Sequence, residues 1–177
     1  MRRRSVLLAI AVLAAGLLVA SLAGAAGGKK VLKADDLTGY QENPDVSTGA
    51  TGSFVATIDD DAQTITYELS YSGIEGGTTS AAHIHFGKRA VNGGVSAFLC
   101  SGGDKPACPA TGGTVTDVID VADIIGPAGQ GIQAGAFDEL VAAMRAGNTY
   151  VNVHSTGGNP AWPGGEIRAQ INDRANN

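Results

Sequence analysis

The chain of 177 residues is poor in the residues that build common catalytic centres. It has two cysteines, one tryptophan and three histidines. It contains no G-x-S-x-G elbow, no phosphate-binding glycine loop and no H-E-x-x-H motif. These absences argue against serine hydrolases, nucleotide-binding enzymes of the P-loop type and zincin proteases. We therefore favour a non-catalytic protein, and an enzymatic function survives only for chemistry that a metal ion would supply.

Basic residues are also scarce. The chain has 12 lysine and arginine residues against 17 aspartate and glutamate residues. Three of the twelve lie at Arg2–Arg4, so removal of residues 1–25 would leave nine against seventeen and a net charge of −8. Nucleic acids and anionic membrane surfaces attract basic patches. We therefore expect the mature protein to bind neither nucleic acid nor a membrane.

The first 25 residues have the pattern of an export signal. Arg2–Arg4 form a basic start, residues 6–20 are an uncharged apolar run, and Ala23-Gly24-Ala25 offers a small-x-small cleavage site. A membrane anchor is the alternative, because apolar or small residues continue to Ala26, close to the ~20 that span a bilayer. The alanine-rich and glycine-rich end favours cleavage. We expect a signal peptide over residues 1–25 and an exported protein, periplasmic or secreted; the arginines do not decide between general and twin-arginine export.

The two cysteines, Cys100 and Cys108, flank a short segment of turn-forming composition. In an exported chain such a pair predicts one disulfide. A redox pair or metal thiolates would favour C-x-x-C spacing, which this pair does not have. Because the loop between them is short, we expect the disulfide to stabilise the protein modestly, by ~2 kcal/mol.

Short segments of alternating apolar and polar residues dominate the rest of the chain. This period of two predicts strands over residues 52–58, 64–71, 82–87, 95–100, 114–119, 150–155 and 165–171. One helix is predicted over residues 134–146, where Phe137, Leu140, Val141 and Met144 form an apolar stripe. Many strands, glycine-rich connections and a single helix indicate an all-β fold, an antiparallel β-sandwich or Greek-key barrel with one short helix.

The mature chain has the size of one domain. After the signal peptide (1–25) we expect a polar lead-in over residues 26–36, with room for a short strand. A β domain over residues 37–173 and a C-terminal tail over residues 174–177 complete this division.

All three histidines fall in two of the predicted strands. His83 and His85 are two residues apart, so they share one face of their strand. His154 shares a face with Tyr150 and Asn152 in the second strand. Neutral imidazole is a ligand for zinc and copper, and three histidines with an open position are typical of catalytic zinc coordination. We therefore hypothesise a metal site of His83, His85 and His154, with zinc or copper as the candidate ion.

A structural polar cluster without a metal is the alternative. Asn152, Glu166 and Arg168 alternate onto polar faces, and they meet the histidines if the three strands share one sheet. They would then either support metal ligands or hydrogen-bond the histidines to fix strand register. Convergence of the imidazoles would favour the metal site, because zinc–nitrogen distances are ~2.0–2.1 Å. Histidines on opposite faces would exclude it.

The same segments resemble the CHRD domain, the module repeated in chordin and found alone in many bacterial exported proteins. The similar segments are, in chain order, LTGYQENP at 37–44, TGATG at 48–52, AAHIHFG at 81–87, YVNVHS at 150–155 and PGGEIRAQI at 163–171. The resemblance covers roughly residues 31–173. One departure is Ala169, where the family usually has glycine after the arginine.

Two function hypotheses follow. Chordin binds extracellular signalling ligands, so the resemblance implies a non-catalytic extracytoplasmic binding or structural module whose partner is an unknown extracytoplasmic protein or envelope component. The second hypothesis is a small metal-binding protein or metalloenzyme that uses the three histidines. The H-x-H strand also resembles that of copper–zinc superoxide dismutases. No histidine remains for that enzyme's other metal ligands, so superoxide dismutation is rejected.

Overall fold

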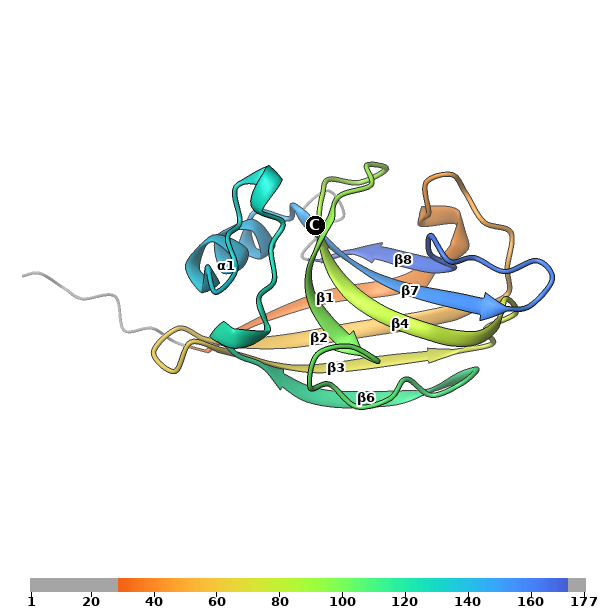
Figure 1. The fold of residues 1–177 in the computed structure, drawn as a ribbon, viewed down its shortest axis with the longest axis horizontal. Helices are drawn as coiled ribbons and strands as arrows, with labels where there is room; N and C mark the ends of the chain where they lie inside the picture. The colour runs from red at the N-terminus through yellow and green to blue at the C-terminus, as the bar shows by residue number, and fades with distance from the viewer. Residues whose placement is uncertain (1–28, 172–177) are drawn as a thin grey trace, which may run out of the picture.

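The computed structural model describes residues 29–171 of the chain. The predicted signal peptide (1–25) and the predicted tail (174–177) lie outside the described residues. Within them, eight strands form one antiparallel sheet in the order β5-β4-β7-β8-β1-β2-β3-β6 (Figure 1). One α-helix and three short 3-10 turns complete this part of the chain. The predicted all-β antiparallel fold with one short helix is confirmed.

The elements agree with the predicted segments, although β4 begins earlier than expected and the helix is shorter. The strands are β1 (Lys30–Thr38), β2 (Thr51–Asp59), β3 (Thr64–Ser72), β4 (Gly77–Phe86), β5 (Gly94–Cys100), β6 (Gly112–Ile119), β7 (Thr149–Gly157) and β8 (Ile167–Gln170). The helix is α1 (Phe137–Arg145), and the 3-10 turns are η1 (Gly39–Gln41), η2 (Val121–Asp123) and η3 (Ala128–Gln130).

The segment expected as a polar lead-in contributes most of β1. This strand pairs with β2 along its length and with β8 at Thr38. Leu32 and Ala34 are buried in the core. The register shifts between Ala34 and Leu37, so the buried positions do not keep a strict period of two. A bulge of this kind inserts an extra residue into a strand, which explains why the alternation does not reveal β1 in the sequence.

The sheet curls until its inner face encloses the apolar core. Each strand contributes buried apolar residues, among them Leu32, Phe54, Leu69, Ile84, Leu99, Val115, Val153 and Ile167. Helix α1 covers one end of the curl with its apolar stripe (Figure 1). Among residues 29–171 no helix is long and apolar enough to span a membrane.

The two edges of the sheet meet near the disulfide. The Tyr67 hydroxyl of β3 donates to the Leu99 carbonyl of β5 at 2.6 Å. Cys100 at the end of β5 is bonded to Cys108 in the segment before β6, which confirms the predicted disulfide. These contacts give the sheet a nearly closed, barrel-like form.

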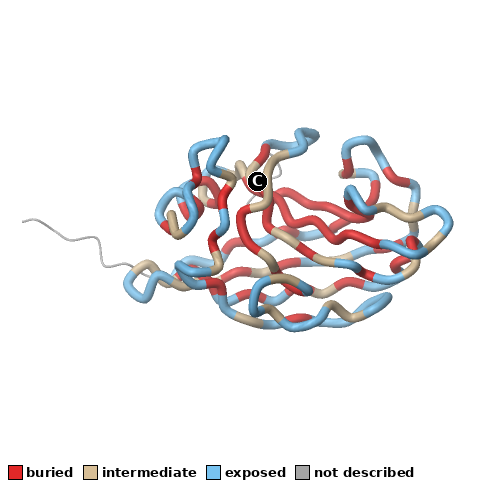
Figure 2. Tube along the Cα trace, viewed as in Figure 1, coloured by how far each residue is buried: buried red, intermediate tan, exposed pale blue. Residues whose placement is uncertain are grey.

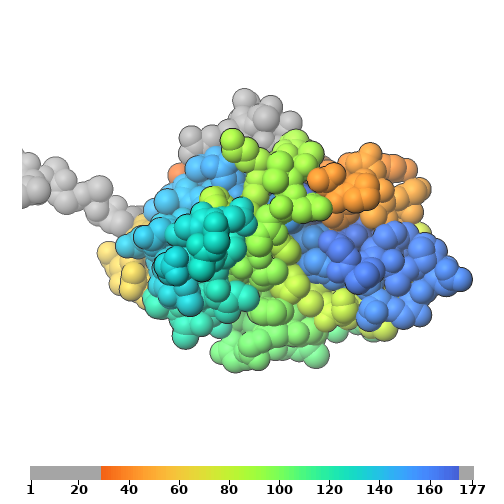
Figure 3. Space-filling view, turned by 45° about the horizontal axis from the view of Figure 1, so that its top comes forward, coloured from red at the N-terminus to blue at the C-terminus, as the bar shows by residue number. Residues whose placement is uncertain are grey.

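Strands β7 and β8 are buried on both faces. Residues 149–155 and 167–170 form continuous buried stretches (Figure 2). Their apolar side chains face the core, and their polar side chains face three loops that lie over the sheet, at residues 39–50, 87–93 and 158–166. Figure 3 shows these loops gathered on one side of the molecule. The sheet therefore has a second, polar buried layer beneath the loops.

Candidate metal centre

Strand register assembles the polar layer. In the strand order, β4, β7 and β8 are neighbours, which confirms that the three predicted strands share a sheet. His154 pairs with Ala81, so it lies diagonally from His83. Side chains opposite or diagonal on one face are ~4.5–8 Å apart. Two rows of paired residues cross the strands: His83–Asn152–Arg168 and His85–Tyr150–Gln170.

The three histidines converge, and we call them the histidine cluster. One ligand nitrogen from each of His83, His85 and His154 lies within 4.8 Å of the other two. The shortest approach joins His83 Nδ1 to His154 Nε2 at 3.0 Å. Nitrogens that bind one tetrahedral zinc ion at ~2.0–2.1 Å lie ~3.4 Å apart, so the most distant pair would have to close by up to ~1.4 Å for one ion to contact all three. Across residues 29–171, this is the only such group of histidine, cysteine or acidic side chains.

Backbone carbonyls fix the tautomers of two of the histidines. His85 Nδ1 is 3.0 Å from the Gly93 carbonyl oxygen, and His154 Nδ1 is 3.0 Å from that of Pro163. A carbonyl only accepts, so both Nδ1 atoms carry the hydrogen and both Nε2 atoms keep a lone pair. Metal-ligating histidines almost always donate their other ring N–H to such an acceptor. The loops over the sheet thus fix the rings so that both Nε2 lone pairs are available to a cation.

The histidine cluster contains a buried lone pair that no donor satisfies. His83 Nδ1 donates to His154 Nε2, because the tautomer of His154 leaves that atom with a lone pair. His85 Nε2 is buried and finds no hydrogen-bond partner among residues 29–171. Leaving a buried acceptor unpaired costs ~1–3 kcal/mol. The cluster is therefore not a fully satisfied hydrogen-bond network.

Burial keeps the imidazoles neutral. Desolvation, with repulsion from the other two histidines, lowers the pKa of His83 to about 3. Desolvation also lowers the pKa of His85 to about 4, against the hydrogen bond to Gly93, with His154 and Arg168 adding to the shift. The pKa of His154 is lowered by burial as well. At neutral pH the ligands therefore need not release a proton to bind a metal ion.

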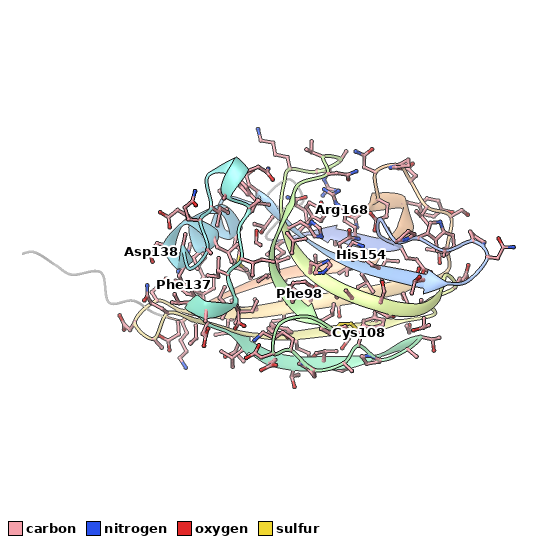
Figure 4. All side chains as sticks on the ribbon, viewed as in Figure 1. Phe98, Cys108, Phe137, Asp138, His154 and Arg168 are labelled. Atoms are coloured by element: carbon pink, nitrogen blue, oxygen red, sulfur yellow. A yellow bond between two sulfur atoms is a disulfide. The ribbon has the colours of Figure 1, made fainter. Side chains whose placement is uncertain are left out.

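Arg168 lies next to the histidine cluster, behind Tyr150. Its guanidinium carbon is 3.4 Å from the centroid of the Tyr150 ring, and that ring stacks on His85 at 4.8 Å and 7°. The guanidinium also donates to the carbonyl oxygens of Lys88 and Val91 at 2.9 and 3.0 Å. Figure 4 labels Arg168 and His154, which come from the neighbouring strands β8 and β7.

Glu42 and Asn152 complete a second group, which with Arg168 we call the arginine cluster. The Asn152 amide donates to Glu42 Oε1 at 2.6 Å and to the Ile167 carbonyl at 3.0 Å. Burial raises the pKa of Glu42 to about 7, against the opposing effects of Asn152 and Arg168. Glu42 is the residue of this polar layer that sequence reasoning missed. It lies outside any predicted strand, and 110 positions separate it from Asn152.

Gly165 makes room for the arginine cluster. Its φ is +132°, and a Cβ here would meet the Asn152 amide and lie 2.7 Å from Glu42 Oε1. Glycine adopts such a backbone conformation readily, and other residues adopt it only with strain. Glycine is therefore required at position 165, before Glu166 in the PGGEIRAQI segment, because a side chain there would collide with Asn152 and Glu42.

Glu166 takes a different place from the one the alternation predicts. It precedes β8, and its carboxylate accepts hydrogen bonds from the Thr48 hydroxyl at 2.8 Å and from the backbone N–H groups of Glu75 and Gly76 at 2.7 and 3.1 Å. These bonds anchor the segments before β2 and β4. The structure thus places Asn152 and Arg168 beside the histidines and gives Glu166 a separate role.

A curled antiparallel sheet, a disulfide and a buried polar layer define an all-β domain that fits an oxidising, extracytoplasmic compartment. The sequence profile of the CHRD domain matches residues 34–171, and the chain belongs to the CHRD domain family. The matched range includes every residue of the histidine and arginine clusters. Comparison with curated proteins and with solved structures gives no match.

Proposed function

We propose that this CHRD domain is exported and binds one transition-metal ion through the histidine cluster. The observation that supports it is the convergence of three neutral imidazoles, two of which have their Nδ1–H groups held by backbone carbonyls. Imidazole suits zinc and copper. The signal-like residues 1–25 and the disulfide support export, and the ion would then be acquired in the periplasm or outside the cell.

Each histidine has an assigned ligand atom in this proposal. His85 and His154 would bind through Nε2, and His83 through Nδ1, which already lies 3.0 Å from His154 Nε2. The hydrogen that His83 Nδ1 donates without the ion would move to Nε2 of the same ring. All three ligands remain neutral imidazoles, so binding needs no net release of a proton.

The enclosure of the cluster supports binding over catalysis. His85 is 7% exposed and His154 is 9% exposed, and Phe98 packs against His83 at 4.6 Å between ring centroids. An ion held here would have little open surface toward a substrate. We therefore propose a metal-binding module and no reaction.

Metal analysis of the exported, mature protein tests the proposal. We expect one zinc or copper ion per chain, and none in a His83→Ala/His85→Ala double variant. Asp61→Asn, in the exposed turn between β2 and β3, is the control and should keep the ion. A wild type that binds neither ion at micromolar concentration, or a double variant that binds as well as the wild type, would contradict the proposal.

Docking of an extracytoplasmic protein or envelope component is a second candidate function. Tyr40 and Val91 are 70% and 50% exposed. They stand on two loops that are joined by hydrogen bonds from Asn43 to Ala90 and from Asn92 to Asn43, at 3.0 and 2.9 Å. Exposed tyrosine is common at binding hot spots.

Retention on isolated envelope fractions tests this candidate. A Tyr40→Ser/Val91→Ser variant should bind the envelope at least tenfold more weakly than the wild type, with its metal content unchanged. Equal retention of the two proteins would exclude this surface as the docking site.

A further inference from the structure

The ligand set of the histidine cluster carries no negative charge. Among residues 29–171 the converging ligand atoms belong to three imidazoles, and no carboxylate or thiolate joins them. The two fully or nearly buried carboxylates nearby in the fold have other partners: Glu42 binds Asn152, and Glu166 binds Thr48 and backbone N–H groups. The cluster with a doubly charged ion bound would therefore carry a net charge of +2, because no ligand neutralises part of the charge.

A buried positive charge also lies next to the cluster. Arg168 is 2% exposed and stays charged at any ordinary pH. It is stacked on Tyr150, which is stacked in turn on His85. A metal cation bound to His85 would be repelled by this charge, which lies on the other face of the Tyr150 ring.

Aromatic rings shield the cluster from water on two sides. Phe98 packs edge-on against His83, and Tyr150 lies parallel to His85. An apolar shell lowers the local dielectric and so shifts the redox potential of a bound metal. Burial of an ion in a low dielectric is costly, and in the Born description the cost rises with the square of the charge. Repulsion from Arg168 rises in proportion to the charge.

We infer that the histidine cluster takes copper in the cuprous state and shifts the equilibrium between Cu²⁺ and Cu⁺ toward Cu⁺. The inference rests on the proposed metal binding and specifies the ion. Cu⁺ carries half the charge of Zn²⁺ or Cu²⁺, and copper is an ion that imidazole ligands suit. Reduction of bound Cu²⁺ takes one electron from an external one-electron donor. It takes no proton, because all three ligands are neutral before and after.

Competition titrations of the mature, disulfide-bonded protein test the ion preference. Cu⁺ is titrated without oxygen against a chromophoric cuprous chelator, and Cu²⁺ and Zn²⁺ are titrated separately against their own chelators. We expect one Cu⁺ per chain, bound at least tenfold more tightly than Cu²⁺ and than Zn²⁺. Ascorbate should abolish the electron paramagnetic resonance signal of the Cu²⁺-loaded protein without release of copper.

Two charge variants test the electrostatic cause. Arg168→Gln removes the positive charge and should weaken the preference for Cu⁺ over Cu²⁺ at least tenfold, a fall in potential of ~59 mV. Arg168→Lys should restore most of it. Glu42→Gln removes the negative charge that offsets Arg168. Measured at pH 8, where the wild-type carboxyl is ionised, this variant should have a stronger preference for Cu⁺ over Cu²⁺. Glutamine resembles a protonated carboxyl, so we expect Glu42→Gln to fold. This variant therefore still tests the electrostatic cause if Arg168→Gln does not fold.

The outcomes separate the two proposals. A preference for Cu⁺ with opposite shifts in Arg168→Gln and Glu42→Gln supports the inference. Tight Zn²⁺ or Cu²⁺ binding that Cu⁺ does not displace overturns the cuprous assignment and leaves metal binding intact. A preference for Cu⁺ that neither variant alters overturns the electrostatic cause. Failure of the wild type to bind any of the three ions overturns both.

Discussion

The arginine cluster and the histidine cluster lie side by side in one buried polar layer, yet they differ in how their polar groups are paired. Arg168 donates to two loop carbonyls and stacks on Tyr150, and Asn152 donates to both Glu42 and a backbone carbonyl. In the histidine cluster, His85 Nε2 finds no partner among residues 29–171. The first group is held by the protein's own contacts, whereas the second leaves the buried lone pair of His85 Nε2 without a donor.

This difference in pairing is the reason why we propose different roles for the two clusters. Buried polar groups that only stabilise a fold are normally all paired. The arginine cluster meets that condition and ties the loops 39–50 and 87–93 to the sheet. The histidine cluster is oriented by loop carbonyls, those of Gly93 and Pro163, but the unpaired lone pair of His85 Nε2 suits a cation better than it suits a hydrogen-bond network.

The largest effect is expected for Arg168→Ala. The change leaves the carbonyls of Lys88 and Val91 without their donor and Glu42 without its charge partner, so we expect a loss of ~3–5 kcal/mol in the free energy of unfolding. Urea denaturation measures it. Lys29→Ala, which breaks an exposed ion pair with Asp59, is the control and should cost at most ~1 kcal/mol. Similar losses in the two variants would show that the arginine cluster has no special structural role.

Gly165→Ala should have the next largest effect. A Cβ at φ +132° would be strained and would meet Asn152 and Glu42, and we expect a loss of ~3 kcal/mol from strain and overpacking together. Gly129→Ala is the matched control, because a Cβ there has no neighbour within 4 Å, and its stability should change by less than ~0.5 kcal/mol. Thermal unfolding compares the two. A Gly165→Ala variant as stable as the wild type would refute the close approach.

The smallest effect is a difference in pH dependence between the clusters. The pKa values of His83 and His85 are lowered from 6.5 to about 3 and 4, so the unfolded chain binds protons first and stability falls as the pH drops below 6.5. The pKa of Glu42 is raised from 4.5 to about 7, so the folded protein binds that proton and stability falls as the pH rises from 4.5 to 7.

Glu42→Gln should remove only the second of these dependences. Relative to the wild type, the variant should gain ~1 kcal/mol of unfolding free energy per pH unit between pH 4.5 and 7. Denaturant unfolding at pH 5, 6 and 7 measures this gain. A difference between the two proteins that does not vary with pH would mean that Glu42 titrates normally in the folded state.

The sequence was sufficient to predict which residues of the histidine cluster share a face. Alternation with a period of two paired His83 with His85 and placed His154 beside Asn152, and these strands do lie together in the sheet. The match of ordered motifs predicted the family, which the profile match confirms. Local periodicity therefore accounts for the strands and for the faces that their side chains occupy.

The contacts between distant segments could not be predicted in this way. The hydrogen bond of Glu42 with Asn152 depends on how a loop before β2 folds over β7, and no local pattern encodes that path. The alternation also placed Glu166 with Arg168, but Glu166 precedes the paired part of β8, and its carboxylate instead binds Thr48 and two backbone N–H groups. The lead-in was expected to hold a short strand at most, and the full length of β1 was not predicted because its bulge breaks the period of two.

Stability with and without metal tests most directly whether the histidine cluster is functional. Zinc or copper at 100 times its dissociation constant should stabilise the wild type by ~2.7 kcal/mol and should leave a His83→Ala/His154→Ala variant unchanged. Without metal, that variant should lose far less stability than Arg168→Ala. No stabilisation of the wild type by either ion, together with a metal-free loss in the histidine variant as large as that of Arg168→Ala, would show that the histidines are structural.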